Sequence, residues 1–317
     1  MAFLASIATS IALLLVAAAP APAGDPPAAG GAVTSLWTDA PADGSRVRVD
    51  QIPDIPEPSD LLIHKGALYT VSDSRKSLYR LDLDKTPGRV VVGGTWQISG
   101  LPAATDLEAL AELPGGEVLL ASETRGNIFV LSSFPDQACA AWETGVSGTC
   151  LFGRANCGVE AIAVLPGGKL LVAKEREPRA AYLFDIPQAA CTAATLGGRT
   201  RLELPDEVGP DISAATYDPV SGHLLLVARA RQKVLELALS ESKEGERSLH
   251  RLELVGSFSF RQTEDSLEYG GLGHHQVEGI AVDEKRVLHL VVDNNERASR
   301  VFGNRRAALL RFFPPPN

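Results

Sequence analysis

Residues 156–177 read NCGVEAIAVLPGGKLLVAKERE and form the clearest unit of an internal repeat. Two apolar runs of strand length flank a Pro-Gly-Gly turn, where Gly supplies a positive φ and Pro restricts the backbone before it. This pattern predicts a β-hairpin. Because a hairpin reverses the chain, Glu160 near the start of the first strand and Glu175 after the second strand lie at the same end.

Four further hairpins of the same kind are predicted along the chain. They span 59–73, 106–123, 211–229 and 276–293. The aligned starts are 46, 52, 53 and 65 residues apart and lie at Asp60, Asp106, Gly158, Asp211 and Gln276. A period of about 40 to 50 residues with several strands in each unit is typical of a β-propeller.

A third strand follows each hairpin, and a fourth, outer strand follows most of them. The last copy has no fourth strand before the sequence ends at Asn317. We therefore expect the segment near 46–49 to complete that blade and close the ring. The prediction is an all-β protein with a single β-propeller domain over 36–317. Five blades are visible, and a sixth, degenerate blade is the alternative.

The first 23 residues are apolar and rich in Ala, and they end in Ala21-Pro22-Ala23. This ending is typical of a secretory signal peptide that is cleaved after Ala23. The segment has no Lys or Arg, and an uncleaved membrane anchor is the alternative. Residues 24–35 predict a disordered spacer, because Pro, Ala and Gly dominate them. We expect the mature protein to be periplasmic or secreted, with no membrane span.

The net charge of −9 argues against a nucleic-acid partner, since no basic stripe alternates with aromatic residues. An acidic balance suits cation binding or simple solubility. The expected partners are a small anionic ligand or an unknown protein, and the expected state is a monomer.

All four cysteines lie between residues 139 and 191. An even, clustered set in an exported protein indicates two disulfides. The pairing Cys139–Cys150 with Cys157–Cys191 keeps each bond within the loops of a single blade, while the other pairings stay open. A zinc site would show a short Cys-x-x-Cys pair, which this sequence lacks.

Two insertions interrupt the repeat. The mixed charges of 240–248 predict a solvated outer loop. Residues 262–275 lead directly into a first strand, on the face that also holds the loops between second and third strands. This segment is expected to overhang the central face like a lid. His274 and His275 within it are either acid–base or ligand groups, or exposed side chains.

The repeat gathers acidic residues at one end of the propeller axis. Glu108, Glu160 and Glu278 stand near the starts of innermost strands, and Glu175 follows a second strand. Converging carboxylates repel one another and lose solvation, so a cation would stabilise them. We predict these four glutamates as ligands of Ca²⁺, which accepts several oxygen ligands in loose geometry.

Further polar residues at the same end form the predicted ligand-binding site, namely Asp106, Asp211, Asp293, Asn294, Arg229 and Lys174. The alternative for the acidic residues is structural, because carboxylates at strand starts also accept backbone N–H bonds between blades. Turn capping explains Asp106 and Asp211 equally well. In the aligned hairpins Leu62 and Ser213 replace the glutamate, so the fold does not require an acid in every blade. We therefore favour a functional role for the retained glutamates.

Three motifs follow one another in a characteristic order: the hairpin 158–178, the hairpin 211–227 and the run 276–281. This order resembles the SdiA-regulated family of exported β-propellers, which is in turn similar to phytase-like esterase propellers. The resemblance covers about residues 55–312. It implies a calcium-associated propeller in the periplasm or cell envelope, with no settled catalytic activity. By position, the four predicted Ca²⁺ ligands match the acidic positions of the family's central site, whereas Leu62 departs from it.

Three functions agree with these features. The first is a calcium-associated propeller that binds or senses a ligand on its central face. The second is a metal-dependent hydrolase of phosphoesters or lactones, in which Ca²⁺ polarises the substrate and a glutamate activates water. The third is a protein-interaction scaffold, which predicts an apolar patch on the central face. We favour the first, because the sequence shows converging carboxylates there without a positioned base.

Overall fold

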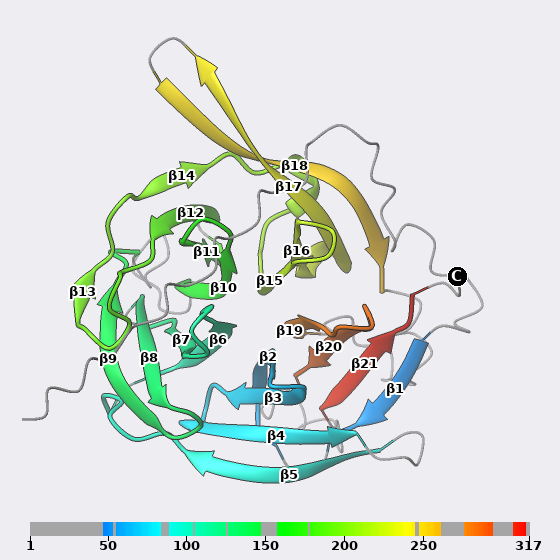
Figure 1. Ribbon diagram of the computed structural model, residues 1–317. Coiled ribbons are helices and arrows are strands. Elements are labelled where there is room, and N and C mark those ends of the chain that lie inside the picture. Colours follow the sequence, from blue (N-terminus) through cyan, green and yellow to red (C-terminus); the bar gives the residue numbers. More distant parts are fainter. Residues whose placement is uncertain are drawn as a thin grey trace, which may run out of the picture. The chain divides into compact units, whose positions relative to one another are not determined.

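Five sheets stand around a central axis in the computed structural model (Figure 1). The structure describes residues 47–52, 55–83, 89–103, 105–124, 126–146, 157–176, 178–244, 247–260, 276–293 and 307–314. Within these residues the protein is a β-propeller with five blades, which confirms the predicted fold.

Each blade runs outward from the axis. Blade 1 consists of β2 (Pro58–His64), β3 (Ala67–Ser72), β4 (Ser77–Leu83) and β5 (Val90–Gln97). Blade 2 consists of β6 (Leu107–Glu112), β7 (Val118–Ser122), β8 (Asn127–Ser133), β9 (Gln137–Glu143) and the short β13 (Ala194–Thr195). Blade 3 consists of β10 (Val159–Leu165), β11 (Lys169–Lys174), β12 (Ala180–Asp185) and β14 (Thr200–Leu202).

The last two blades complete the ring. Blade 4 consists of β15 (Ala214–Asp218), β16 (His223–Ala228), β17 (Lys233–Glu244) and β18 (Arg247–Ser259). Blade 5 consists of β19 (Val277–Val282), β20 (Leu288–Val292), β21 (Ala308–Phe312) and β1 (Val47–Gln51). Two 3₁₀ turns, η2 (Asp206–Val208) and η3 (Arg229–Arg231), stand before β15 and after β16.

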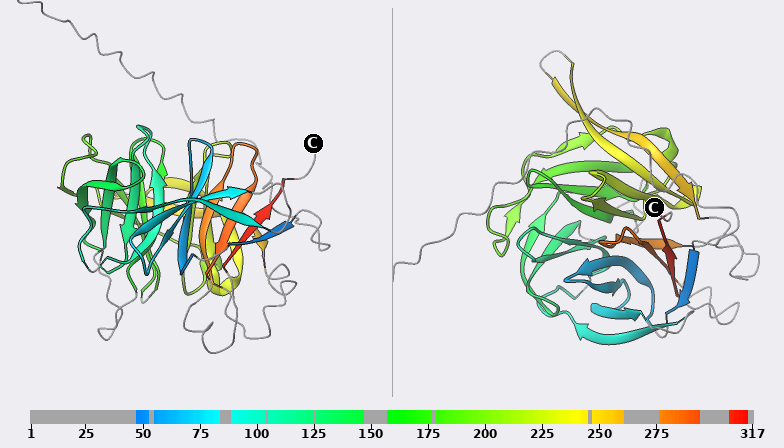
Figure 2. Two further views of the ribbon diagram at one scale, coloured as in Figure 1. Left: turned by 90° about the horizontal axis from the view of Figure 1, so that it is seen from below. Right: turned by 45° about the vertical axis from the view of Figure 1, so that its right-hand side comes forward.

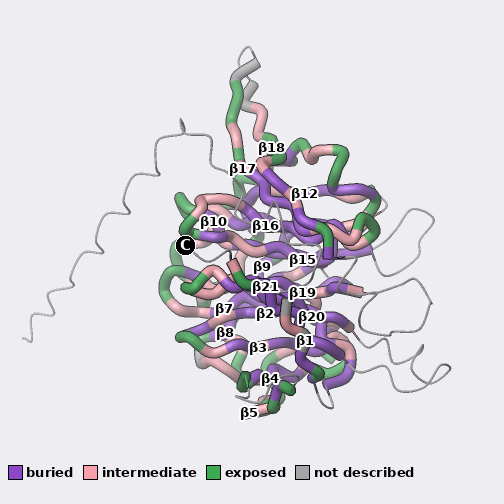
Figure 3. The backbone as a smooth tube through the Cα atoms, turned by 90° about the vertical axis from the view of Figure 1, so that its right-hand side faces the viewer, coloured by how far each residue is buried: buried purple, intermediate pink, exposed green. Residues whose placement is uncertain are grey.

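The hydrophobic core lies between adjacent blades. Ile162 of β10 belongs to a cluster shared with blade 2, and its neighbour Ala163 belongs to a cluster shared with blade 4. Side chains alternate along a strand, so each innermost strand supports the blades on both of its sides. In Figure 3 the inner strands are mostly buried, and exposed residues gather at turns and on outer strands.

The innermost strand carries a β-bulge near its start in blades 1, 2, 3 and 5. The bulged residues are Ser59, Glu108, Glu160 and Glu278. In blade 4, the N–H of Ser213 donates to Val227 O at 3.2 Å, while Ala214 also pairs with Val227. Ser213 therefore holds the same position. A bulge turns one side chain out of the regular alternation, and here it does so once in each of these four blades, 1, 2, 3 and 5.

The predicted alignment of Leu62 with Glu108 is wrong. In blade 2 the N–H of Glu123 donates to Asp106 O at 3.1 Å, and in blade 1 the N–H of Asp73 donates to Glu57 O at 3.1 Å. Glu57, not Asp60, is thus the counterpart of Asp106, and Ser59 is the counterpart of Glu108. The alignment was displaced because Asp60, like Asp106, is an acidic residue that directly precedes apolar residues.

The ring closes as predicted. Strand β1 pairs antiparallel with β21 from Val47 opposite Phe312 to Gln51 opposite Ala308, and the two lie side by side in Figures 1 and 2. Asp50 of β1 is fully buried and accepts from Arg311 of β21, with Nε at 2.8 Å and Nη2 at 2.6 Å from Oδ2. A buried ion pair therefore joins the two strands that complete blade 5.

The prediction of a solvated loop at 240–248 is wrong. Strands β17 and β18 continue through this segment in one register, up to Glu244 opposite Arg247. They form a two-stranded arm that extends beyond the ring in Figure 1. Alternation of polar residues along two paired strands produces the same mixed charge as a loop.

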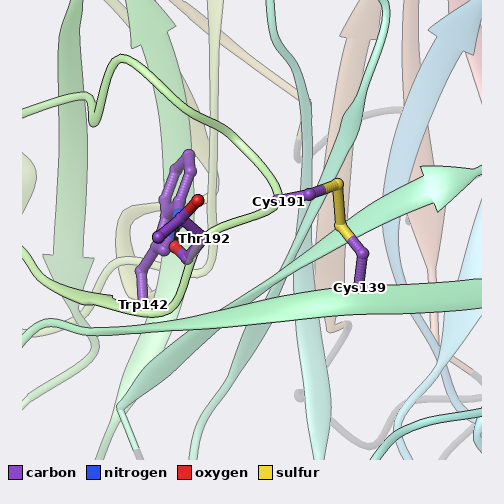
Figure 4. The surroundings of a disulfide bond; sticks show 4 residues. All are labelled: Cys139, Trp142, Cys191 and Thr192. Atoms are coloured by element: carbon purple, nitrogen blue, oxygen red, sulfur yellow. Dashed lines mark hydrogen bonds between the residues drawn. A yellow bond between two sulfur atoms is a disulfide. The ribbon is translucent and has the colours of Figure 1, made fainter.

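The two predicted disulfide pairings, Cys139–Cys150 and Cys157–Cys191, are also wrong. The structure has a Cys139–Cys191 bond with a Cα–Cα distance of 5.3 Å. After β12 the chain crosses back to blade 2, where β13 pairs in parallel with β9. Trp142 Nε1 of β9 donates to Thr192 O at 3.1 Å beside the bond (Figure 4). Cys157 is also disulfide-bonded, and Cys150 lies outside the described residues.

Several predictions fall outside the described residues, namely those for the signal peptide over 1–23, the spacer over 24–35, the lid over 262–275 and Asn294. Within the described part of the chain, no helix has the length and apolar character needed to cross a membrane.

Candidate functional site

Residues from all five blades line a cavity of about 390 Å³ at the end of the axis where the innermost strands start. Its acidic lining residues are Glu57, Asp73, Asp106, Glu108, Glu160, Glu175, Glu278 and Asp293. Arg176 and Arg229 are the cationic residues among the described ones that line it. We call this the acidic cavity. It brings together seven predicted site residues, the four Ca²⁺ ligands with Asp106, Asp293 and Arg229.

The two halves of the cavity differ because Arg229 pairs with acidic residues in only one of them. Its Nη1 donates to Glu278 Oε1 at 2.6 Å and Oε2 at 2.7 Å, its Nη2 donates to Glu175 Oε1, and its Nε donates to Asp211 Oδ2 at 3.3 Å. The side chain of Arg229 is only 12% exposed, so these bonds form in a poorly solvated place. The half of the cavity near Glu175 and Glu278 therefore contains its own fixed cation.

The position of Arg229 follows from the repeat. In the other blades the residue immediately after the second strand is an acid, namely Asp73, Glu123, Glu175 and Asp293. In blade 4 this residue is Arg229, at the start of η3. Asp211 Oδ1 accepts from the N–H of Ala230 at 2.8 Å and so holds its carboxylate beside the guanidinium. Arg176 Nε adds a second cation, 2.9 Å from Glu175 Oε2.

The other half of the cavity contains a cluster of uncompensated carboxylates. One oxygen from each of Asp73, Asp106 and Glu108 lies within 4.8 Å of the others. Burial and the neighbouring Glu57 raise the pKa of Asp73 to about 8, and the same two causes raise the pKa of Asp106. Burial and the charge of Glu160 raise the pKa of Glu108 well above its usual value. Each raised pKa means that the ionised carboxylate is disfavoured at this place when no cation is beside it.

A second cluster, formed by Glu123, Glu160 and Glu175, lies toward the Arg229 half, again with one oxygen each within 4.8 Å. Burial raises the pKa of Glu160 well above its usual value, and the charges of Glu175 and Glu278 add to this. The pKa of Glu175 rises to about 7 through burial, although Arg229 opposes the shift. Glu123 is fixed between blades because Oε1 accepts from the N–H of Gly158 at 3.1 Å.

Three charged residues that line the cavity, Glu57, Asp73 and Arg176, were not among the predicted site residues. Glu57 precedes Pro58 and was placed outside the repeat by the displaced alignment, yet it lines the cavity and has a left-handed backbone with φ of 46°. Strained backbones of this kind often occur at functional sites. Asp73 is the last residue of the predicted hairpin 59–73, and nothing in its spacing distinguishes it from a solvated acid. Its burial appears only when the blades meet.

The remaining predicted residues lie elsewhere. Lys174 is buried at the end of β11 and does not line the cavity. Asp60 is buried below it, where Oδ1 accepts from the N–H of Leu61 at 2.8 Å and of Ile280 at 3.2 Å, and Oδ2 accepts from the N–H of Leu110 at 2.7 Å. Asp60 therefore joins the innermost strands of blades 1, 2 and 5. A side chain at Gly279 would approach the Cα of Asp60 to 2.5 Å, so glycine is needed there.

The raised pKa of Asp73 predicts a pH-dependent effect of Asp73→Asn in the cation-free protein. An aspartate ionises near about 3.9 when unfolded, whereas Asp73 holds its proton up to about 8 in the fold beside Glu57, Asp106 and Asp293. A raised pKa contributes stability at low pH that is lost as pH rises through the folded value. Relative to the wild type, Asp73→Asn is expected to stabilise progressively above about pH 4, by about 2 kcal/mol at pH 8 after solvent screening is discounted.

Urea unfolding in EDTA at several pH values measures this difference. Asp82→Asn, on an exposed strand end, is the matched control and should show little pH dependence. If the gain in unfolding free energy of Asp73→Asn over the wild type stays constant or shrinks as pH rises, the raised pKa of Asp73 is contradicted.

Several solved structures are similar to this chain at low sequence identity. The chain is similar to a Myxococcus xanthus glutaminyl cyclase at 15% identity and a TM-score of 0.49, over 86% of this chain and 99% of that chain. It is similar to a Staphylococcus aureus virginiamycin B lyase at 10% identity and a TM-score of 0.45, over 77% and 80% of the two chains. A luciferin-regenerating enzyme matches at 12% identity and a TM-score of 0.49, over 84% and 95%. No curated protein matches the sequence.

The sequence itself gives the more specific match. The model of the SdiA-regulated family matches residues 62–296, which contain every described strand except the first part of β2 and the strands β21 and β1 that complete blade 5. The predicted resemblance is confirmed, and the chain belongs to the SdiA-regulated family.

Proposed function

We propose that the protein is an exported, calcium-binding propeller that binds a ligand in the acidic cavity, with Asp73, Asp106 and Glu108 at the centre of the cation site. One observation carries this proposal. These three carboxylates place oxygens within 4.8 Å of one another in the half of the cavity that Arg229 does not reach, whereas Arg229 holds Glu175 and Glu278 in the other half.

The donor set suits Ca²⁺. Calcium binds oxygen at about 2.3 to 2.6 Å, so two of its ligands lie at most about 5 Å apart. The spacing of the three carboxylates is within that limit, and smaller ions such as Mg²⁺ demand tighter, more regular shells. Asp73 Oδ1 is buried and has no hydrogen-bond partner among the described residues. A cation at this place would supply the missing partner.

The bound ion would also supply positive charge to the cavity. Eight acidic residues among the described ones line it, against two arginines that are both paired with Glu175. Without a cation this cavity repels anions, whereas a bound Ca²⁺ would give a small anionic ligand a positive centre to coordinate directly. Glu160 lies close enough to raise the pKa of Glu108, and so belongs to the same environment.

The test is a Ca²⁺ titration of the EDTA-treated protein, followed by melting and by calorimetry, for the wild type, Glu108→Gln and Glu278→Gln. Both glutamates are bulged residues that line the cavity, but only Glu278 is held by Arg229. Calcium at a hundredfold excess over its Kd should stabilise the wild type by about 2.7 kcal/mol. Glu108→Gln is expected to weaken Ca²⁺ binding at least about tenfold, because a charged ligand is lost. Glu278→Gln should keep its response to Ca²⁺.

Two outcomes would overturn the proposal. If Ca²⁺ leaves the melting of the wild type unchanged, the cluster is not a calcium site. If Glu278→Gln abolishes the response and Glu108→Gln retains it, the ion belongs to the Arg229 half.

Export is proposed from two observations. The sequence begins with an apolar segment that ends in a small-x-small pattern at Ala23, and the described part of the protein contains the Cys139–Cys191 disulfide. Disulfides persist in oxidising compartments such as the periplasm and the extracellular medium. The intact mass of the protein recovered from the periplasm or the medium tests this, since cleavage after Ala23 leaves Gly24 as the first residue.

A further inference from the structure

A second cavity, of about 500 Å³, lies at the opposite ends of the same five innermost strands. We call it the apolar cavity. Each innermost strand contributes at least one half-buried residue to its wall, and these are Ile63, Glu112, Val164, Thr216, Tyr217 and Val282. A concave, mostly apolar site of a few hundred Å³ with a few polar groups is the usual form of a small-molecule site.

The two cavities are separate. Along β2, Pro58 and Ser59 line the acidic cavity, and Leu61 is the first residue to line the apolar one. Asp60 between them lines neither and bonds to the strands on both sides. The apolar cavity therefore has its own walls, and nothing in its lining depends on a cation in the acidic cavity.

The charged group in the wall of the apolar cavity restricts the chemical class of ligand that can bind there. Glu112 is the only charged residue among the described ones that line it. Its side chain is 32% exposed, and Oε1 lies 3.1 Å from Nδ1 of the buried His64, without the geometry of a hydrogen bond. An anion has no cationic partner in this lining. A wholly apolar ligand would cover the carboxylate without replacing its water, which is costly.

We propose that the apolar cavity binds a small amphipathic amine. The aliphatic body of the ligand packs against Ile63, Val164 and Val282, whose partly exposed surfaces lose contact with water on binding. The ammonium group points to Glu112, where a charge-assisted hydrogen bond replaces the lost hydration. Tyr217 adds an aromatic surface with a polar end to the same wall.

The test compares three probes of equal chain length, n-octylamine, 1-octanol and octanoate, by calorimetry at pH 8 with EDTA present. The wild type is expected to bind one octylamine, octanol about tenfold more weakly, and octanoate not measurably. Glu112→Gln should weaken octylamine about tenfold and leave octanol unchanged, because only the charged hydrogen bond is lost.

Val282→Trp is the second variant, since an indole at this position fills the cavity. It should abolish the binding of octylamine and octanol. Val91→Trp, at a residue 39% exposed on the outer strand β5, is the matched control and should bind as the wild type does. The proposal is overturned if octylamine does not bind, if Val282→Trp leaves binding intact, or if octanoate binds as tightly as octylamine. Chelator in every arm keeps this outcome independent of the calcium site.

Discussion

Asp60→Ala is expected to lower the free energy of unfolding by roughly 3 to 6 kcal/mol, because it removes the acceptor of three buried backbone N–H groups. The side chain bonds to Leu61, Leu110 and Ile280, from three different innermost strands. Burial raises the pKa of this carboxyl well above its usual value, although the three N–H donors oppose the shift. Alanine would leave the donors without a partner in a place that water cannot fill.

Denaturant unfolding in EDTA measures the loss. Asp106→Ala is the matched control, because the two aspartates have similar places in the sequence pattern. Asp106 lies in the acidic cavity among other carboxylates, so its removal should be neutral or stabilising without a cation. Asp60→Asn retains one acceptor oxygen. Its loss in the free energy of unfolding should therefore lie between those of Asp60→Ala and Asp106→Ala. The assignment is refuted if Asp60→Ala destabilises no more than Asp106→Ala.

Arg311→Met is the second substitution with a large expected effect, a loss of about 3 to 5 kcal/mol, because it leaves the fully buried Asp50 without its main cation. Arg48 Nε remains 2.9 Å from Asp50 Oδ1, but that arginine is more exposed. Replacing both partners, in Asp50→Leu with Arg311→Met, should recover much of the loss, since apolar side chains of similar size often replace a buried ion pair at little cost.

The matched control is Arg80→Met on β4. Arg80 pairs with Asp82 at 2.9 Å, but both side chains are exposed, by 37% and 49%. Exposed pairs contribute little to stability because water and salt screen them, so this variant should unfold almost as the wild type does. Equal losses for Arg311→Met and Arg80→Met in urea unfolding would show that the bond between β1 and β21 is not important for closing the ring.

The blades were predictable from sequence because each hairpin is a local structure. The turn at Pro166-Gly167-Gly168 and the apolar runs beside it determine β10 and β11 without help from the rest of the chain. Ring closure was predictable as well, since a blade that lacks its outer strand must take one from elsewhere. The bulge at Ser59 was not, because one extra residue leaves no mark in the apolar pattern.

The errors at the cysteines and in the site have a different origin. Cys139 meets Cys191 because β13 leaves its own blade and pairs with β9, a contact between blades that spacing along the chain does not encode. The sequence placed Glu160, Glu278 and Arg229 at one end of the axis. It gave no sign that Arg229 would hold Glu278, because that contact depends on how blades 4 and 5 pack.

Blade 4 also breaks the symmetry of the propeller. A ring of five identical blades would offer a ligand on its axis five equivalent orientations, each populated equally. Among the described residues, blade 4 has Ser213 where blades 2, 3 and 5 have a bulged glutamate, and Arg229 where the other four blades have an acid. One side of the cavity therefore contains a fixed cation and the other does not. A polar ligand bound there has one preferred direction, which the single arginine after the second strand of blade 4 selects.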